Sequence, residues 1–351
     1  MFSYIFKKLR FGQIQNHCRT EETIHEQKAQ LEFSQELEEN LDTLKGIIGN
    51  SNDIIIRKFA FGSKKRIQAA LIFIDGLIDK TLVNENIMKP LMLNIHYIYD
   101  EAATEINNIH YIESNLISVG DIEETYSINN AVDRFLSGDT ILLLDGSKEA
   151  LIISLHGWKT RSIEEPKTEP VVRGPREGFS ETLRINTALL RRKIKNTNFI
   201  FESVELGVRT KTDICIAYIN GLANPKIIEE IRRRLKRINT DAILESGYIE
   251  QFIEDAPFSI FSTIANSEKP DKVAAKLLEG RVAILVDGTP MVLTVPMVFI
   301  ESFQSAEDYY SRPFFASMIR LLRFLSYSIS ILAPALYVAL TTFHQELIPT
   351  P

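Results

Sequence analysis

Two stretches of the 351-residue chain repeat each other, and this duplication constrains the fold more than any other feature of the sequence. The stretch DIIIRKFAFGSKKRIQAALIFIDGL, which starts at Asp53, aligns without a gap with NFIFESVELGVRTKTDICIAYINGL, which starts at Asn198. Gly76 falls on Gly221, a separation of 145 residues. A chain built in this way is expected to fold into two similar units rather than around one large core.

A second pair of matching stretches completes each repeat. SGDTILLLDGSKEALIISL and EGRVAILVDGTPMVLTVPM match at a separation of 142 residues, so a three-residue deletion lies between the two halves of the repeat. Each contains an Asp-Gly dipeptide between two apolar runs, which is a strong signal for a β-hairpin because both residues tolerate positive φ. Asp75, Asn220, Asp145 and Asp287 occupy corresponding turns, so backbone geometry explains these residues better than catalysis does.

Between the first strands and the hairpin of each repeat, the apolar spacing becomes helical. In IIEEIRRRLKRI, Ile228, Ile231 and Leu235 recur every three or four residues, as on the buried face of an amphipathic helix. The basic run of the same helix follows two glutamates, which is typical of a solvated face with ion pairs. We therefore predict an α/β fold, with two similar α/β subdomains from an internal duplication at residues 51–158 and 197–303.

The C-terminal part contains a candidate transmembrane helix. Residues 324–343, FLSYSISILAPALYVALTTF, carry no charge, and a helix of this length spans about 30 Å at roughly 1.5 Å per residue, the thickness of a hydrocarbon core. Arg312, Arg320 and Arg323 precede the span and no Lys or Arg follows it, so the positive-inside rule predicts a cytoplasmic N-terminal part. We expect these arginines at the membrane interface, within a segment 304–351 that joins a juxtamembrane helix to the span.

The bulk composition is that of a folded protein and argues against several classes. Apolar residues make up 45% and charged residues 25% of the chain, and the net charge is -6, which disfavours global disorder and a nucleic-acid-coating role. Cys18 and Cys215 are too few and too far apart for a disulfide framework or a thiolate metal site. The chain has no Walker loop, HExxH or GxSxG motif. We expect no catalytic residue, no metal and no cofactor.

The segment that joins the repeats carries the most unusual motif of the chain. Residues 159–196 begin as a semi-rigid, proline-bearing linker and continue into RGPREGFSETLRINTALLRRKIKN, which predicts a helix with a basic face. Ser180 is expected to cap this helix. Arg184 and Arg191 are expected on an open basic stripe along it.

Two interpretations of the motif are open. Glycines and arginines before a helix N-terminus can bind an anion, although Glu177 and Glu181 in the same place oppose a phosphate. The other interpretation, which the sequence favours, is a hinge or an inter-subunit contact. Its candidate residues are Arg173, Gly174, Pro175, Arg176, Glu177, Gly178, Phe179, Arg184 and Arg191.

This motif resembles a hallmark of the A-subunit family of bacterial spore germinant receptors, the GerA family. The stretch ESFQSAEDYYSRP and the approach to the membrane, IRLLRFLSYSISILAPALYVALTTFHQELIPTP, are similar to that family as well. The resemblance covers nearly the whole chain and is weakest over residues 1–40, part of a polar, mostly helical N-terminal segment expected at 1–50. Members carry two similar cytoplasmic subdomains followed by several membrane helices, of which this chain contains one.

The resemblance implies a non-enzymatic receptor subunit in the inner membrane of the dormant spore. Such a subunit would couple nutrient sensing to ion release, work beside receptor B and C subunits, form a homo-oligomer and bind no nucleic acid. Two alternatives stay open. A stage V sporulation AF-type protein of the same family would act on ion release without sensing a nutrient, and a membrane-tethered enzyme or small-ligand-binding protein would hold its site between the two subdomains.

Overall fold

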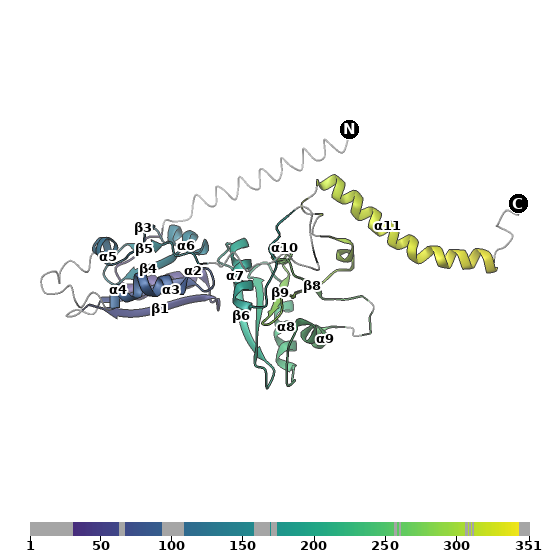
Figure 1. The fold of residues 1–351 in the computed structure, drawn as a ribbon, viewed down its shortest axis with the longest axis horizontal. Coiled ribbons are helices and arrows are strands. Elements are labelled where there is room, and N and C mark those ends of the chain that lie inside the picture. Colours follow the sequence, from purple (N-terminus) through teal and green to yellow (C-terminus); the bar gives the residue numbers. More distant parts are fainter. Residues whose placement is uncertain are drawn as a thin grey trace.

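The computed structural model describes residues 31–62, 67–92, 109–157, 169, 174–255, 258–259, 261–305, 308, 310 and 312–343. Figure 1 shows two α/β subdomains in chain order, followed by a long helix, α11, that extends away from them. We call the described residues up to 157 subdomain 1 and those from 174 to 305 subdomain 2. The predicted fold class, two similar α/β subdomains followed by a candidate membrane helix, is confirmed.

Subdomain 1 starts with a helix and continues through a sheet with helices on its faces. Its elements are α2 (Leu37–Ile48), β1 (Ile54–Phe61), β2 (Ile67–Ile74), α3 (Lys80–Val83), η1 (Asn84–Met88), α4 (Lys89–Met92), α5 (Ile109–Asn115), β3 (Ile122–Thr125), α6 (Ile128–Leu136), β4 (Thr140–Leu144) and β5 (Ala150–Ile153).

Subdomain 2 follows the same plan and leads into the membrane helix. Its elements are α7 (Leu183–Lys193), β6 (Phe199–Leu206), β7 (Thr212–Ile219), α8 (Pro225–Arg237), α9 (Ser246–Ile253), β8 (Ala265–Ser267), α10 (Pro270–Leu278), β9 (Val282–Val286), β10 (Val292–Val295) and the short 3-10 helix η4 (Phe299–Phe303). After these come α11 (Pro313–Val338) and η6 (Ala339–Phe343).

The two sheets have the same topology. The strand order is β1-β2-β4-β5-β3 in the first sheet and β6-β7-β9-β10-β8 in the second, and every strand pair is antiparallel. The first two strands of each sheet pair in register, with Ile54 opposite Ile74 and Phe199 opposite Ile219. The Asp-Gly turns at 145–146 join β4 to β5, as the hairpin signal predicts.

Helices cover both faces of each sheet. In subdomain 1, α2 and α6 pack on one face, while α3, η1, α4 and α5 pack on the other. In subdomain 2, α7 and α10 share a core on one face, while α8 and α9 pack on the other. Burial on both faces explains why the central strands β4 and β9 are continuous apolar runs, TILLL and VAILV, rather than alternating ones.

The repeat extends to the helix that opens each subdomain. FSQELEEN before and in α2 matches FSETLRIN before and in α7. The Asn40 side-chain amide donates to the Ser34 carbonyl at 2.7 Å, and Asn186 donates to the Ser180 carbonyl at 2.6 Å, so both loops fold alike. We therefore propose that each unit starts at this FSxxLxxN motif, which places α7 in subdomain 2 rather than in a separate linker. The domain limits expected above stay a prediction.

The hairpin turn of each sheet caps the opening helix. The Leu183 amide donates to the Asp287 carboxylate at 2.9 Å, and the Leu37 amide donates to Asp145 at 3.2 Å. The expectation that Ser180 caps α7 is wrong, since the cap position falls on Thr182 and its side chain makes no capping bond. A carboxylate from a distant turn takes that role because the sheet folds the turn against the helix N-terminus.

The last described helix is the candidate membrane span. Residues from Pro313 to Phe343 form one helical segment that is long and apolar enough to cross a bilayer, and no part of its most apolar window is buried. Pro334 lies inside the helix, a position that membrane helices tolerate. Phe324 and Tyr327 of this helix contact Phe303 of η4, so the helix packs against subdomain 2.

Candidate functional site between the two subdomains

Helix α7 lies between the two sheets and contacts one corner of subdomain 1 (Figure 1). This corner consists of the residues just before β1 and just after β2, namely Ser51, Asp53, Asp75 and Gly76, and we call it the docking corner. The backbone amide of Asp75 donates to the Asp53 carbonyl at 2.8 Å, which joins its two halves. Since α7 opens subdomain 2, this contact decides how the two subdomains are held together.

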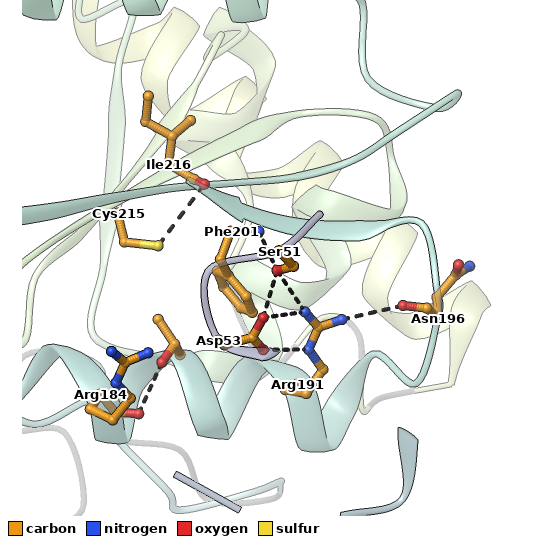
Figure 2. A network of polar contacts seen from close by, with 9 residues as sticks. Ser51, Asp53, Arg184, Arg191, Asn196, Phe201, Cys215 and Ile216 are labelled. Carbon is orange, nitrogen blue, oxygen red and sulfur yellow. Dashed lines mark hydrogen bonds and ion pairs between the residues drawn. The ribbon is translucent and has the colours of Figure 1, made fainter. Parts of the chain in front are cut away.

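Arg191 of α7 and Asp53 form a buried, two-pronged ion pair at the centre of the contact. Nε of Arg191 donates to Oδ2 of Asp53 at 2.8 Å and Nη2 donates to Oδ1 at 2.9 Å (Figure 2). The two side chains are 1% and 2% exposed. Paired hydrogen bonds in this geometry fix the orientation of both planes as well as their separation.

Ser51 ties the ion pair to the second sheet. Its hydroxyl donates to Asp53 Oδ1 at 2.5 Å and accepts from Arg191 Nη2 at 3.2 Å and from the Phe201 backbone amide at 3.0 Å. The Asn52 amide donates to the Phe201 carbonyl at 3.0 Å. The residues before β1 therefore pair with β6, an edge strand of the other subdomain, and the contact is built from backbone as well as side chains.

Aromatic rings complete the surroundings of the guanidinium group. The Cζ atom of Arg191 lies 5.0 Å from the ring centroids of both Phe199 and Phe201, within cation–π range. Nη1 donates to the Asn196 carbonyl at 3.3 Å. Because each charge has several partners, the pair is stable as a unit, whereas removal of one partner would leave the other charge buried and uncompensated, at a cost of about 3–5 kcal/mol.

A second, more exposed pair joins the same surfaces. Nε of Arg184 lies 3.2 Å from the Asp75 carboxylate, and Nζ of Lys80 lies 2.8 Å from its other oxygen. Beside it, Gly76 has φ +93°, and a Cβ there would come within 3.0 Å of the Ala188 side chain and 3.2 Å of the Arg184 carbonyl. Gly76 thus lets α7 approach the turn closely.

The prediction of an open basic stripe on α7 is wrong for the residues in the middle of that stripe, Ala188 and Arg191. Arg191 is 1% and Ala188 6% exposed, because this face of the helix packs against subdomain 1 rather than solvent. Arg184 stays half-exposed, with 47% of its side chain accessible. Helical spacing identified a face of α7 that is distinct from its core face, but not the surface that covers it.

A cavity of about 150 Å³ lies beside the network, and Asn52, Asp53, Arg184, Thr187 and Cys215 are among the residues that line it. This volume is below the roughly 300–1,000 Å³ of most ligand pockets. Burial raises the pKa of the Cys215 thiol far above its ordinary range, with the Asp53 charge as the next cause. A thiol held in its neutral form is a poor nucleophile. The arrangement is suited to holding two bodies together.

The remaining residues of the RGPREGF motif lie on the approach to α7. A Cβ at Gly174 would come within 2.7 Å of the Tyr310 ring, so this glycine packs under a residue near the membrane helix. Glu177 forms ion pairs with Arg192 at 3.3 Å and Lys193 at 3.7 Å. Gly178 and Phe179 are buried, Pro175 is half-buried and Arg176 is exposed. The prediction for Arg173 lies outside the described residues.

The anion-site interpretation loses its basis at the start of α7. The Leu183 amide there already donates to Asp287, and the Gly288 amide donates to the Glu181 carbonyl at 2.7 Å. A carboxylate of the chain itself therefore occupies the place where a bound anion would sit. The hinge or contact interpretation stays a prediction, and the geometry of Arg184 and Arg191 is that of a contact.

The arginines expected at the membrane interface lie at the N-cap and in the first half of α11. Arg320 and Arg323 lie 3.0 and 2.8 Å from the Asp308 carboxylate, which is 3% exposed. Burial works to raise the pKa of Asp308, but hydrogen bonds from Arg323, the Ser305 amide and Arg320 outweigh it, so that this pKa lies below its usual range. Arg312 is exposed at the N-cap of the helix. Two of the three arginines thus anchor α11 to the segment before it.

Sequence reasoning did not identify Ser51 and Asp53, and it assigned Asp75 to turn geometry alone. A signal was present in the unequal charges of the repeat. Asp53 and Asp75 correspond to Asn198 and Asn220, so the first copy carries acid where the second carries amide. A basic helix between two such copies is expected to bind the acidic one.

The fold and the contact together define a class of protein: two copies of one α/β unit are joined by a buried arginine and followed by a candidate membrane helix. The Bacillus/Clostridium GerA spore germination protein model matches residues 42–351 of the chain. The chain belongs to the GerA family of spore germination proteins.

Individual relatives agree with this assignment. Spore germination protein KA of Bacillus subtilis is 44% identical over 318 residues, which cover 91% of this chain and 57% of that protein. Stage V sporulation protein AF of the same organism is 31% identical over 278 residues, 79% of this chain and 55% of its own length. The chain therefore spans little more than half the length of these two relatives.

A solved structure is similar as well. The crystal structure of the N-terminal domain of the A subunit of the Bacillus megaterium spore germinant receptor GerK3 superposes with a TM-score of 0.58 at 36% identity. The match covers 78% of this chain and 99% of that one. Family and structure support a role in spore germination, and the candidate span of α11 indicates membrane association.

Proposed function

We propose that this chain is a non-enzymatic subunit of a spore germinant receptor complex that couples nutrient sensing to ion release. The observation that carries the proposal is the buried Arg191–Asp53 pair, which joins two copies of one unit directly upstream of a candidate membrane helix. A signal reaching subdomain 1 then passes through α7 to subdomain 2, and from there to α11. The contact acts as the joint of this path.

The link from subdomain 2 to the membrane helix supports this direction of transmission. The Phe303 ring of η4 lies 5.6 Å from Phe324 and 5.1 Å from Tyr327 of α11, centroid to centroid. Asp308 holds two arginines of the same helix by charge. Apolar and ionic contacts together resist rotation of α11 against subdomain 2, so a movement of the subdomain would be carried into the helix.

The proposed surroundings follow from the family. We place the chain in the spore inner membrane with its N-terminal part in the cytoplasm, because arginines precede the candidate span. Receptor B and C subunits and further copies of the same chain are the proposed partners. The exposed side of α11, which includes Leu321, Leu325, Ile329 and Leu332, is apolar surface that lipid or such partners would cover.

A stage V sporulation AF-type role is the second candidate function. Deletion of the gene distinguishes it from the receptor-subunit role. Spores that lack a receptor subunit are expected to lose the response to particular nutrients and to keep the response to others. Spores that lack an AF-type protein are expected to release ions more slowly after every trigger. Potassium release, recorded separately for a panel of single amino acids and sugars, distinguishes the two patterns.

The joint itself is tested in spores that carry the chain in its natural gene. Arg191→Met is expected to slow potassium release in rich nutrient broth by about tenfold or more, if the joint contributes at least about 1.4 kcal/mol to the responsive state. Lys45→Met changes the equivalent, exposed position of α2 and is the matched control. Receptor abundance is measured by immunoblot in each strain.

Unchanged potassium release with Arg191→Met at normal abundance would remove the joint from the mechanism. Where abundance falls, Arg184→Gln provides the second variant, because it removes only the half-exposed pair with Asp75 and leaves the buried one intact. An intermediate slowing is expected for it. Release as fast as in the wild type, at normal abundance, would contradict the proposal equally.

A further inference from the structure

Subdomain 2 contains another cavity, at the edge of its sheet opposite to β6, the strand that contacts subdomain 1. It has a volume of about 350 Å³ and lies beside β8, the last strand of the order β6-β7-β9-β10-β8. Its walls come from α9, β8, α10, β10 and η4. The volume falls within the range of small-molecule sites, roughly 300–1,000 Å³, and none of its lining residues belongs to the contact between the subdomains.

The lining combines a few apolar side chains with many hydrogen-bonding groups. Ile264, Val273 and Met297 supply apolar surface. The hydroxyl and amide side chains of the lining are Ser262, Asn266, Ser267, Thr294, Ser302, Gln304 and Ser305. Hydroxyl and amide groups beside apolar side chains suit a compact molecule with several hydroxyl groups, whose oxygens bond to the polar groups and whose carbons contact the apolar ones.

The charged side chains that line the cavity differ in whether they form ion pairs. Lys272 pairs with Glu169 at 2.6 Å, and Lys276 lies 3.2 Å from Glu279 and 3.4 Å from Glu301. Glu250 of α9 differs from these, since no cation in the described part of the chain lies within ion-pair distance of its carboxylate.

The surroundings of Glu250 leave its carboxylate poorly compensated. Burial is the largest cause that raises its pKa, followed by the charges of Glu254 and Glu245, and the Ser262 hydroxyl opposes them only in part. A carboxylate that is partly desolvated and faces like charges gains most from a cation placed against it. The cavity therefore offers one site for an ammonium group among many sites for hydroxyl groups.

We propose that this cavity binds a small polyhydroxylated amine, with the ammonium group of the ligand on Glu250 and its hydroxyl groups on the serine, threonine and asparagine side chains of the lining. Amino sugars belong to this class. The site stands apart from the joint at Arg191, and it exists in the fold whether or not the chain works in a receptor complex.

One wall of the cavity connects it to the membrane helix. Glu301 and Ser302 of η4 line the cavity, while Phe299 and Phe303 of the same short helix contact Tyr327 of α11, with ring centroids 6.2 and 5.1 Å apart. Arg281 forms an ion pair with Glu301 and so holds η4 against the sheet. A ligand that orders Ser302 and Glu301 would also order the turn on which α11 rests.

The test uses the full chain in lipid nanodiscs with glucosamine as the probe and glucose as the analogue that lacks the amine. Calorimetric titration at neutral pH is expected to give saturable binding of glucosamine and at least about tenfold weaker binding of glucose, or about 1.4 kcal/mol. Glu250→Gln keeps the shape of the side chain and is expected to weaken glucosamine by the same factor. Glu229→Gln, on the exposed face of α8, is the matched control.

Hydrogen exchange provides the second measurement. Glucosamine is expected to slow amide exchange in η4 and in the part of α11 around Tyr327, and to leave exchange in subdomain 1 unchanged. Ser302→Ala changes a lining residue on a different element, η4, and should weaken binding without affecting the fold, which keeps the test decisive if Glu250→Gln is unstable. Equal binding of glucose and glucosamine, binding that is unchanged in both variants, or no saturable binding of glucosamine would overturn the proposal.

Discussion

The two subdomains share one backbone plan but differ in the charge and burial of the same corner. In subdomain 1 the corner carries Asp53, whose side chain is 2% exposed against α7. In subdomain 2 the equivalent residues Asn198 and Asn220 are exposed. The turns themselves are alike, since Gly76 and Gly221 both have positive φ. The duplicated sequence thus fixes the turn, and the charged side chains occur where one copy meets the other.

The helices that open the two subdomains, α2 and α7, differ in burial in the same way. Arg191 of α7 and Lys45 of α2 hold equivalent positions, yet their side chains are 1% and 48% exposed. Leu77 and Leu222, which follow the corner turns, are 0% and 50% exposed. Position within the repeat therefore sets local structure, while burial and ionic partners depend on which copy the residue belongs to.

The largest expected effect comes from the two equivalent basic residues. Arg191→Met leaves Asp53 buried without its partner and should lower the free energy of unfolding by about 3–5 kcal/mol. Lys45→Met removes an exposed side chain and should change it by no more than about 0.5 kcal/mol. Denaturant unfolding of the purified chain measures both. Similar small changes in the two variants would erase the difference between the copies.

The same comparison predicts a coupling energy. When Asp53→Asn is combined with Arg191→Met, the double variant should be less unstable than the sum of the two single variants, because the second change removes the uncompensated charge. Additive losses would show that the two side chains act independently despite their contact.

A smaller effect is expected at the two corner glycines. Gly76→Ala and Gly221→Ala both force a Cβ into the left-handed region, at a cost of roughly 1–2 kcal/mol. Gly76→Ala also places that Cβ 3.0 Å from Ala188, whereas Gly221 has nothing within 4 Å. The difference between the two variants, roughly 1–3 kcal/mol for a tight contact, therefore reports the subdomain contact alone. Equal losses of thermal stability would mean that α7 moves away at no cost.

The smallest effect concerns acid stability and is confined to subdomain 2. The hydrogen bond from Arg232 is the main cause that lowers the pKa of Glu202, against burial that raises it. A lowered folded-state pKa gives stability that is present above the unfolded value, near about 4.3, and is lost as the pH falls through the folded value. Glu202→Gln should therefore flatten the decline of the melting temperature below pH 4.3. If the melting temperature of Glu202→Gln fell with pH as steeply as that of the wild type, the pair of Glu202 and Arg232 would not contribute to acid stability.

Much of the fold could be predicted from the sequence because the duplication shows the first strand pair and the hairpin of each subdomain twice. The Asp-Gly hairpins, the helical spacing around Ile231 and the uncharged span before Phe343 each depend on local sequence, and each appears in the structure. The candidate site depends on which surfaces meet. Nothing near Arg191 in the sequence indicates that Asp53, 138 residues away, covers it.

The sequence therefore predicts that the charge of Arg191 faces solvent, although in the structure it is paired with the distant Asp53. The FSxxLxxN motif would have placed α7 inside the second unit, but its two copies differ in most other residues. The capping role of Asp287 was equally hidden, because the hairpin turn reaches α7 only in the folded sheet. Sequence spacing identifies a face of a helix, and tertiary structure decides what lies against that face.

The joint between the subdomains is tested most directly by the distance between them. Spin labels at Asp42→Cys and Asp241→Cys, both on exposed side chains of different subdomains, report this distance by pulsed electron resonance in a chain with Cys18→Ser and Cys215→Ser. The wild-type joint predicts one narrow distance distribution, and Arg191→Met predicts a broad one. Identical narrow distributions in both would contradict a joint held by Arg191 and Asp53.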